Sequence, residues 1–145
     1  MGHDISLYKT KSKKIQITNC FPVTGQGNYK ADLIDGRLVP QTLQDDLYIT
    51  HNLAEIIYIA LENIKEPKKC FGEFLDGSKA KDILPTIEKM FDEIISNPKI
   101  YQPLEPEPDP ETGRAWGSYK GLCDKLYALI FACRKYPTAI IYDWY

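Results

Sequence analysis

Three segments of the sequence repeat apolar residues at helical spacing, and this periodicity constrains the fold more than any other feature. The segments cover residues 53–64, 83–95 and about 118–135. Such spacing gathers the apolar side chains on one face of an α-helix, and that face must pack against another element. The sequence therefore predicts three amphipathic helices, and we expect Ser78 to be the N-cap of the second.

The two ends of the chain have the pattern of strands. Residues 5–8 and 15–18 alternate apolar and polar side chains around a polar loop, which indicates an antiparallel hairpin. Residues 47–49 form a short strand candidate, and residues 138–145 are rich in strand-forming types. We therefore expect an α+β fold, in which the N-terminal hairpin and a C-terminal strand form a small antiparallel sheet packed against about three helices.

Two further segments lack periodicity. Residues 20–40 contain glycines and prolines and are expected to form a long loop. Residues 104–111 alternate prolines with acidic residues and are expected to be an extended connector, or alternatively a docking strap or lid. With 145 residues in total, we interpret residues 1–145 as a single domain.

Charge and composition bound the class of protein. Eighteen Lys and Arg residues against twenty Asp and Glu residues give a net charge of −2, so nucleic acid is not an expected partner of the molecule as a whole. We find no apolar run long enough for a membrane span and no leader, and we expect a cytoplasmic protein without a membrane partner. The four cysteines are scattered, which favours buried thiols over a metal site, and no cofactor or metal is expected.

The first candidate binding site is Thr50-His51-Asn52, where a predicted strand meets a predicted helix. The N–H groups at a helix start attract phosphate or carboxylate, and these three side chains would add donors. The alternative is that Thr50 simply caps the helix beside a half-exposed His51 that has no role in binding. The other histidine, His3, is expected to lie in a frayed terminus.

The second candidate site is the start of the third helix, where Arg114, Trp116 and Tyr119 surround a glycine. The aromatic rings could stack on a ligand and the arginine could neutralise its charge, although Trp116 could equally anchor the helix on the core. A third candidate is the basic cluster from Lys9 to Lys14 beside Tyr8. It is typical of a solvated turn that protects an edge strand, and it could also hold a nucleic-acid backbone or a nucleotide.

Signatures of catalysis are missing from the sequence. The glycines at residues 25 and 27 have neither the Gly-Lys-Ser/Thr ending nor the following helix of a phosphate loop, and no serine or cysteine lies in a nucleophile elbow. We therefore assign no catalytic residue and expect a binding protein rather than an enzyme. An enzyme with His51 as general base is the less favoured alternative.

Two motifs carry a resemblance. Tyr48-Ile49-Thr50-His51-Asn52-Leu53 and Trp116-Gly117-Ser118-Tyr119-Lys120-Gly121-Leu122, together with shorter matches near both ends, resemble a group of small, mostly uncharacterised bacteriophage and prophage proteins. The resemblance implies an α+β fold and a phage or mobile-element origin, which would place the protein in the host cytosol. It implies no activity for particular residues.

Together these patterns and the resemblance favour an oligomeric, non-enzymatic phage accessory protein that binds an anionic small molecule such as a nucleotide, as in the sequestration of an immune signal. The alternative is a protein-interaction module that inhibits a host protein through its tyrosines and its acidic proline segment.

Overall fold

A computed structural model of the protein describes residues 2–10, 13–15, 47–66, 71–113 and 117–144. The strands are β1 (Gly2–Thr10), β2 (Lys13–Ile15), β3 (Leu47–Thr50) and β4 (Ile140–Trp144). The helices are α3 (Ala54–Asn63), α4 (Phe71–Leu75), α5 (Ala80–Ser96), α6 (Pro98–Tyr101) and α7 (Tyr119–Lys135), with 3-10 turns η2 (His51–Leu53) and η3 (Gln102–Leu104).

Strand β1 is the centre of the sheet. On one side it pairs antiparallel with β4, with Leu7 opposite Ile141. On the other side its first half pairs with β3 and its second half pairs with β2, again antiparallel. The C-terminal strand therefore returns to the N-terminal hairpin, as the sequence predicts.

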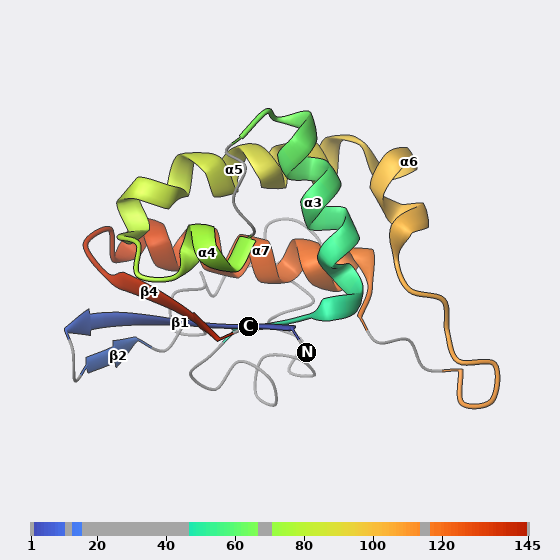
Figure 1. Ribbon diagram of the computed structural model, residues 1–145, viewed down its shortest axis with the longest axis horizontal. Coiled ribbons are helices and arrows are strands. Elements are labelled where there is room, and N and C mark those ends of the chain that lie inside the picture. Colours follow the sequence, from blue (N-terminus) through green and yellow to red (C-terminus); the bar gives the residue numbers. More distant parts are fainter. Residues whose placement is uncertain (1, 11–12, 16–46, 67–70, 114–116, 145) are drawn as a thin grey trace, which may run out of the picture.

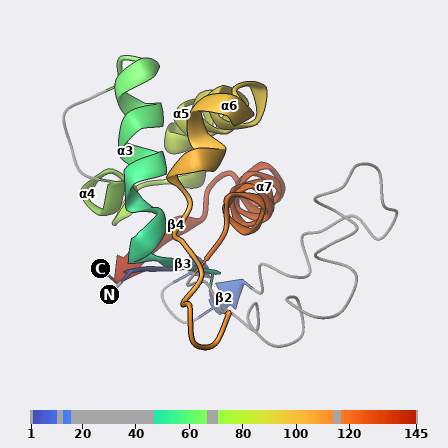
Figure 2. The same ribbon diagram turned by 90° about the vertical axis from the view of Figure 1, so that its right-hand side faces the viewer.

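All of the described helices lie on the same side of the sheet (Figure 1). In both views α4 and α7 lie next to the sheet and α5 lies beyond them, while α3 runs from the sheet edge up to α5 (Figure 2). The buried apolar residues form one cluster between these layers, to which β1 contributes Ile5 and Leu7 with no exposed surface. Burial of this cluster is the main force that holds the helices on the sheet.

The predicted α+β class is confirmed, and the three long helices α3, α5 and α7 correspond to the three periodic segments. The structure adds two short helices, α4 and α6, which span five and four residues. Segments so short contain too little of a helical repeat for periodicity to reveal them.

Two local predictions are wrong. Ser78 does not cap α5, because Lys79 is the N-cap residue and the Ser78 hydroxyl donates a hydrogen bond to the Phe74 carbonyl oxygen over 2.9 Å. His3 does not lie in a frayed end, because it belongs to β1 and pairs with Ile49 of β3. Backbone pairing to a neighbouring strand orders the N-terminal residues.

The remaining segments are only partly described. Within the acidic proline segment, residues 105–111 form neither helix nor strand, as expected, whereas Leu104 is the last residue of the 3-10 turn η3. The loop expected at residues 20–40, two of the cysteines (Cys20 and Cys70) and the end of the hairpin at 16–18 lie outside the described residues. The other two cysteines, Cys123 and Cys133, are buried in α7.

Candidate functional site

The two sequence motifs meet in space at a junction made by residues 50–53 and 117–119. Gly117 has φ +96°, a left-handed conformation that side chains rarely adopt. A Cβ atom built on Gly117 would lie 2.6 Å from Thr50 Cγ2 and 3.0 Å from Leu53 Cδ1. Glycine is therefore required here for two reasons, and its bare backbone lets the start of α7 pack directly on the turn that follows β3.

On the first side of the junction, the chain passes from β3 through η2 into α3. Thr50 is the N-cap residue of this turn, with φ −65° and ψ 146°, but its side chain makes no capping hydrogen bond. His51 and Asn52 are exposed, and Leu53 is buried and anchors the turn on the core. The N–H groups at this helix start thus have no side-chain cap from Thr50, and two polar side chains lie beside them.

The second side of the junction is already satisfied by groups of the chain itself. The Ser118 hydroxyl accepts a hydrogen bond from the Gly121 N–H over 3.0 Å, as an N-cap residue does. The Glu105 carboxylate accepts a hydrogen bond from the Tyr119 N–H over 2.8 Å. Glu105 belongs to the acidic proline segment, so this segment is fastened to the start of α7 by a charged hydrogen bond.

The Tyr119 ring lies in the core. The residue is 8% exposed, and its hydroxyl donates a 2.7 Å hydrogen bond to the Ile94 carbonyl oxygen of α5. The Tyr119 side chain therefore links α7 to α5 through its hydroxyl. Because the side chain is buried, the structure does not favour the role expected from the sequence, in which the ring stacks on a ligand. The other two residues expected beside it, Arg114 and Trp116, lie outside the described residues.

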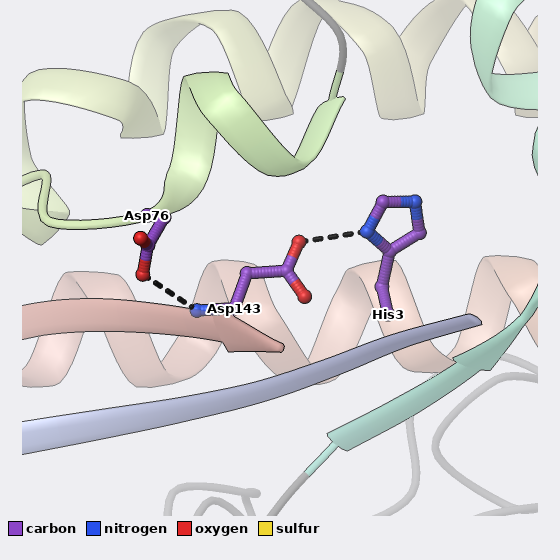
Figure 3. Close-up of polar contacts among 3 residues, drawn as sticks. All are labelled: His3, Asp76 and Asp143. Carbon is purple, nitrogen blue, oxygen red and sulfur yellow. Dashed lines mark hydrogen bonds and ion pairs between the residues drawn. The ribbon is translucent and has the colours of Figure 1, made fainter. Parts of the chain in front are cut away.

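A second polar site was not expected from the sequence. His3 of β1 and Asp143 of β4 are 140 positions apart, yet His3 Nδ1 lies 2.7 Å from Asp143 Oδ2. The Asp143 side chain has no exposed surface, whereas the His3 side chain is 15% exposed. Figure 3 shows this pair between the sheet and α4, with the Asp143 N–H donating to Asp76 Oδ1 over 3.1 Å.

The geometry of this pair assigns the imidazole tautomer. A carboxylate oxygen can only accept, so the hydrogen lies on His3 Nδ1. The other oxygen, Asp143 Oδ1, is buried and has no hydrogen-bond partner in the described part of the chain. The sequence did contain a signal for this site: His3 has the same alternation phase as Ile5 and Leu7, and Asp143 has the phase of Ile141, so all four positions face the core.

In the described part of the chain, two titratable side chains have shifted pKa values, and both belong to helices. Burial raises the pKa of the Tyr101 hydroxyl above its ordinary value, the hydrogen bond from Asn63 opposes this shift, and the acceptor Glu93 adds to it. Burial lowers the pKa of the Lys125 ammonium group. Neither residue belongs to the junction, so we assign both a structural role.

Within the described ranges, no helix is long and apolar enough to cross a membrane, and no three His, Cys, Asp or Glu side chains gather as metal ligands would. Comparison with protein-family models, curated proteins and solved structures found no significant match to the chain. The site is therefore interpreted from its geometry and chemistry.

Proposed function

We propose that the protein is a non-enzymatic binding protein for an anionic, nucleotide-like small molecule, which it holds at the junction. The observation that carries this proposal is the close approach of Gly117 to Thr50 and Leu53, which unites the two motifs at adjacent helix starts. A helix start presents N–H groups and the positive end of the helix dipole to an anion.

The anion belongs on the side of the junction formed by residues 50–53. There the cap residue Thr50 leaves the N–H groups without a side-chain acceptor, and the exposed His51 and Asn52 can donate further hydrogen bonds. On the other side, Glu105 already occupies the anion position of α7. Arg114 would neutralise charge and Trp116 would stack on a ring, while Tyr119 would support the site from the core.

The biological setting belongs to the same proposal. The resemblance to phage and prophage proteins favours action in the host cytosol, where sequestration of a nucleotide signal would counter bacterial immunity. A homo-oligomer would suit that task because each subunit offers one junction.

Thermal-shift and calorimetric titration against cyclic and linear nucleotides tests the proposal. A ligand at about 100 times its dissociation constant stabilises a folded protein by about 2.7 kcal/mol, which for a chain of this size is a rise in Tm of about 5–10 °C. We expect such a rise for one nucleotide class, and we expect the His51→Ala/Trp116→Ala variant to lose it. Lys99→Ala, an exposed lysine of α6, is the matched control and should bind like the wild type.

Two results would overturn the proposal: no nucleotide changes Tm, or the His51→Ala/Trp116→Ala variant binds as tightly as the wild type. Product analysis of the same mixtures separates the enzymatic alternative, because an enzyme with His51 as base would turn the nucleotide over and His51→Ala would abolish that turnover.

One observation favours the protein-interaction module as a second candidate. Tyr58 of α3 is 55% exposed and Ile100 of α6 is 50% exposed, so each offers apolar surface that a protein partner could cover. Pull-down from a bacterial lysate with the wild type and a Tyr58→Ala/Ile100→Ala variant tests this candidate. A stoichiometric protein partner that only the wild type retains would support it.

A further inference from the structure

The Glu105 carboxylate is a charged group of the junction that the proposed function leaves without a ligand contact. Glu105 follows η3, its N–H donates to the Gln102 carbonyl oxygen over 3.2 Å, and the neighbouring Leu104 packs against the core. Its carboxylate accepts a hydrogen bond from the Tyr119 N–H over 2.8 Å. The residue is therefore held at its backbone and at the end of its side chain, so its charge has a defined place.

That place adjoins the anion side of the junction. Tyr119 follows two residues after Gly117, and a Cβ atom on Gly117 would lie 2.6 Å from Thr50 Cγ2. The Glu105 carboxylate and the turn at residues 50–53 thus lie on the two sides of the same close contact.

The Glu105 carboxylate has room to accept further hydrogen bonds. A carboxylate has two oxygens with about four acceptor positions in total. Among the residues that the structure describes, the Glu105 side chain makes one hydrogen bond, through Oε2, and no ion pair. The residue is half-buried, so part of its surface is open to a ligand.

The junction therefore has two electrostatic poles. The turn at residues 50–53 presents N–H groups together with the exposed His51 and Asn52, which favour a negatively charged group. Glu105 favours hydrogen-bond donors and repels negative charge. A ligand that matches both poles carries an anionic group at one end and N–H donors at the other.

We propose that Glu105 is the specificity-determining residue of the junction and that it selects a guanine nucleotide. This inference rests on the proposed function, in which residues 50–53 hold the anionic group of the ligand. Guanine carries a ring N–H and an exocyclic amino group side by side, and these donors match the two oxygens of a carboxylate. Adenine has only the amino group on that edge, and uracil has carbonyl oxygens on both sides of its ring N–H.

Calorimetric titration with the 5′-monophosphates of guanosine, inosine, adenosine and uridine (GMP, IMP, AMP and UMP) tests this inference. IMP differs from GMP only in lacking the exocyclic amino group. Because hydrogen bonds to charged groups are the stronger ones, we expect the wild type to bind GMP about 10-fold or more tightly than IMP. AMP and UMP should also bind more weakly than GMP.

Two variants assign the preference to Glu105. Glu105→Gln keeps an oxygen that can accept from the Tyr119 N–H but loses the charge and one of the two acceptor oxygens, so it should bind GMP and IMP with similar affinity. Its binding of IMP also reports that the junction still forms. Glu107→Gln removes an exposed carboxylate two residues away and is the matched control, which should keep the preference for GMP.

The inference is overturned if the wild type binds GMP and IMP equally, or if Glu105→Gln keeps the preference for GMP. In both cases the bound nucleotides would still support the proposed function. If none of the four monophosphates binds although another nucleotide raises Tm, the guanine selection alone fails. If no nucleotide raises Tm, the guanine selection and the proposed function fail together.

Discussion

Replacement of His3 by phenylalanine should destabilise the fold, because it removes the hydrogen-bond donor to a buried carboxylate. The variant keeps an aromatic ring beside Phe71, whose ring lies 5.1 Å from that of His3, but it removes the hydrogen-bond donor of Asp143. The Asp143 side chain has no exposed surface, and Oδ1 has no hydrogen-bond partner among the described residues. The variant would therefore leave a buried carboxylate without compensation.

The magnitude follows from the burial of that charge. Removal of the donor leaves a buried acceptor unsatisfied, which costs about 1–3 kcal/mol, and the absence of any exposed surface on the Asp143 side chain argues for the upper end of this range. About 3 kcal/mol corresponds to a fall in Tm of about 6–12 °C for a chain of this size. Urea unfolding followed by circular dichroism should show a lower midpoint with an unchanged slope.

A double variant separates the charge effect from simple loss of packing. His3→Phe/Asp143→Leu removes both polar partners, and we expect it to recover most of the stability lost in His3→Phe, because apolar groups of similar volume can replace a buried pair without great cost. His51→Ala is the matched control: it removes the exposed histidine and should change stability by less than about 0.5 kcal/mol. A cost below about 1 kcal/mol for His3→Phe, or a double variant no more stable than the single one, would refute the reasoning.

Three further predictions concern single side chains. Tyr101→Phe removes the buried hydroxyl that donates to the half-buried Glu93 carboxylate and accepts from Asn63, and it should cost about 0.5–1.5 kcal/mol in urea unfolding at neutral pH. Because the pKa of Tyr101 is raised from 10.0 in the folded state, the hydroxyl contributes its full stabilisation below pH 10.0 and loses it as the pH rises through the folded-state pKa. The stability difference between the wild type and Tyr101→Phe should therefore shrink at alkaline pH, and a constant difference would contradict the prediction. Gly117→Ala should lower the free energy of unfolding by about 1–3 kcal/mol, because alanine is strained in the left-handed conformation of Gly117. The clash of the added Cβ with Thr50 should increase this loss, and a loss below about 1 kcal/mol in thermal unfolding would contradict the prediction. Lys125→Met should raise the free energy of unfolding at neutral pH, because burial lowers the pKa of Lys125 and so disfavours its charged form in the folded state. The stability of the wild type should approach that of the variant as the pH rises toward 10.5, and a variant less stable than the wild type at pH 7 would contradict the prediction.

The fold was largely predictable because its elements are encoded locally. Helices α3, α5 and α7 each bury a face whose spacing is visible in the sequence, and β1 and β4 have the composition of strands. The N-cap of α5 was mispredicted for a reason that is also local: Ser78 can bond either to N–H groups ahead of it or to the Phe74 carbonyl oxygen behind it, and the sequence does not say which.

The candidate site was predictable only in part. The sequence indicated both motifs at helix starts, and the structure places Thr50 against Gly117. The sequence could not show that Glu105 accepts a hydrogen bond from the Tyr119 N–H. Glu105 belongs to the acidic proline segment, and a segment without apolar periodicity does not indicate which element it will pack against. It also could not show that the ring of Tyr119 would be directed into the core, since tyrosine suits both surfaces and interiors.

By itself the sequence determined which stretches become helices and strands and which face of each is apolar, because these properties depend on neighbours a few residues apart. Only the tertiary structure decided which stretches meet. The approach of Gly117 to Thr50 and the bond between His3 and Asp143, 140 positions apart, depend on strand order and helix packing. Such contacts form only when folding brings residues that are far apart in the sequence into one core. A local sequence pattern can therefore predict that a residue lies on the inner face of the sheet, but it cannot predict which residue will contact it there.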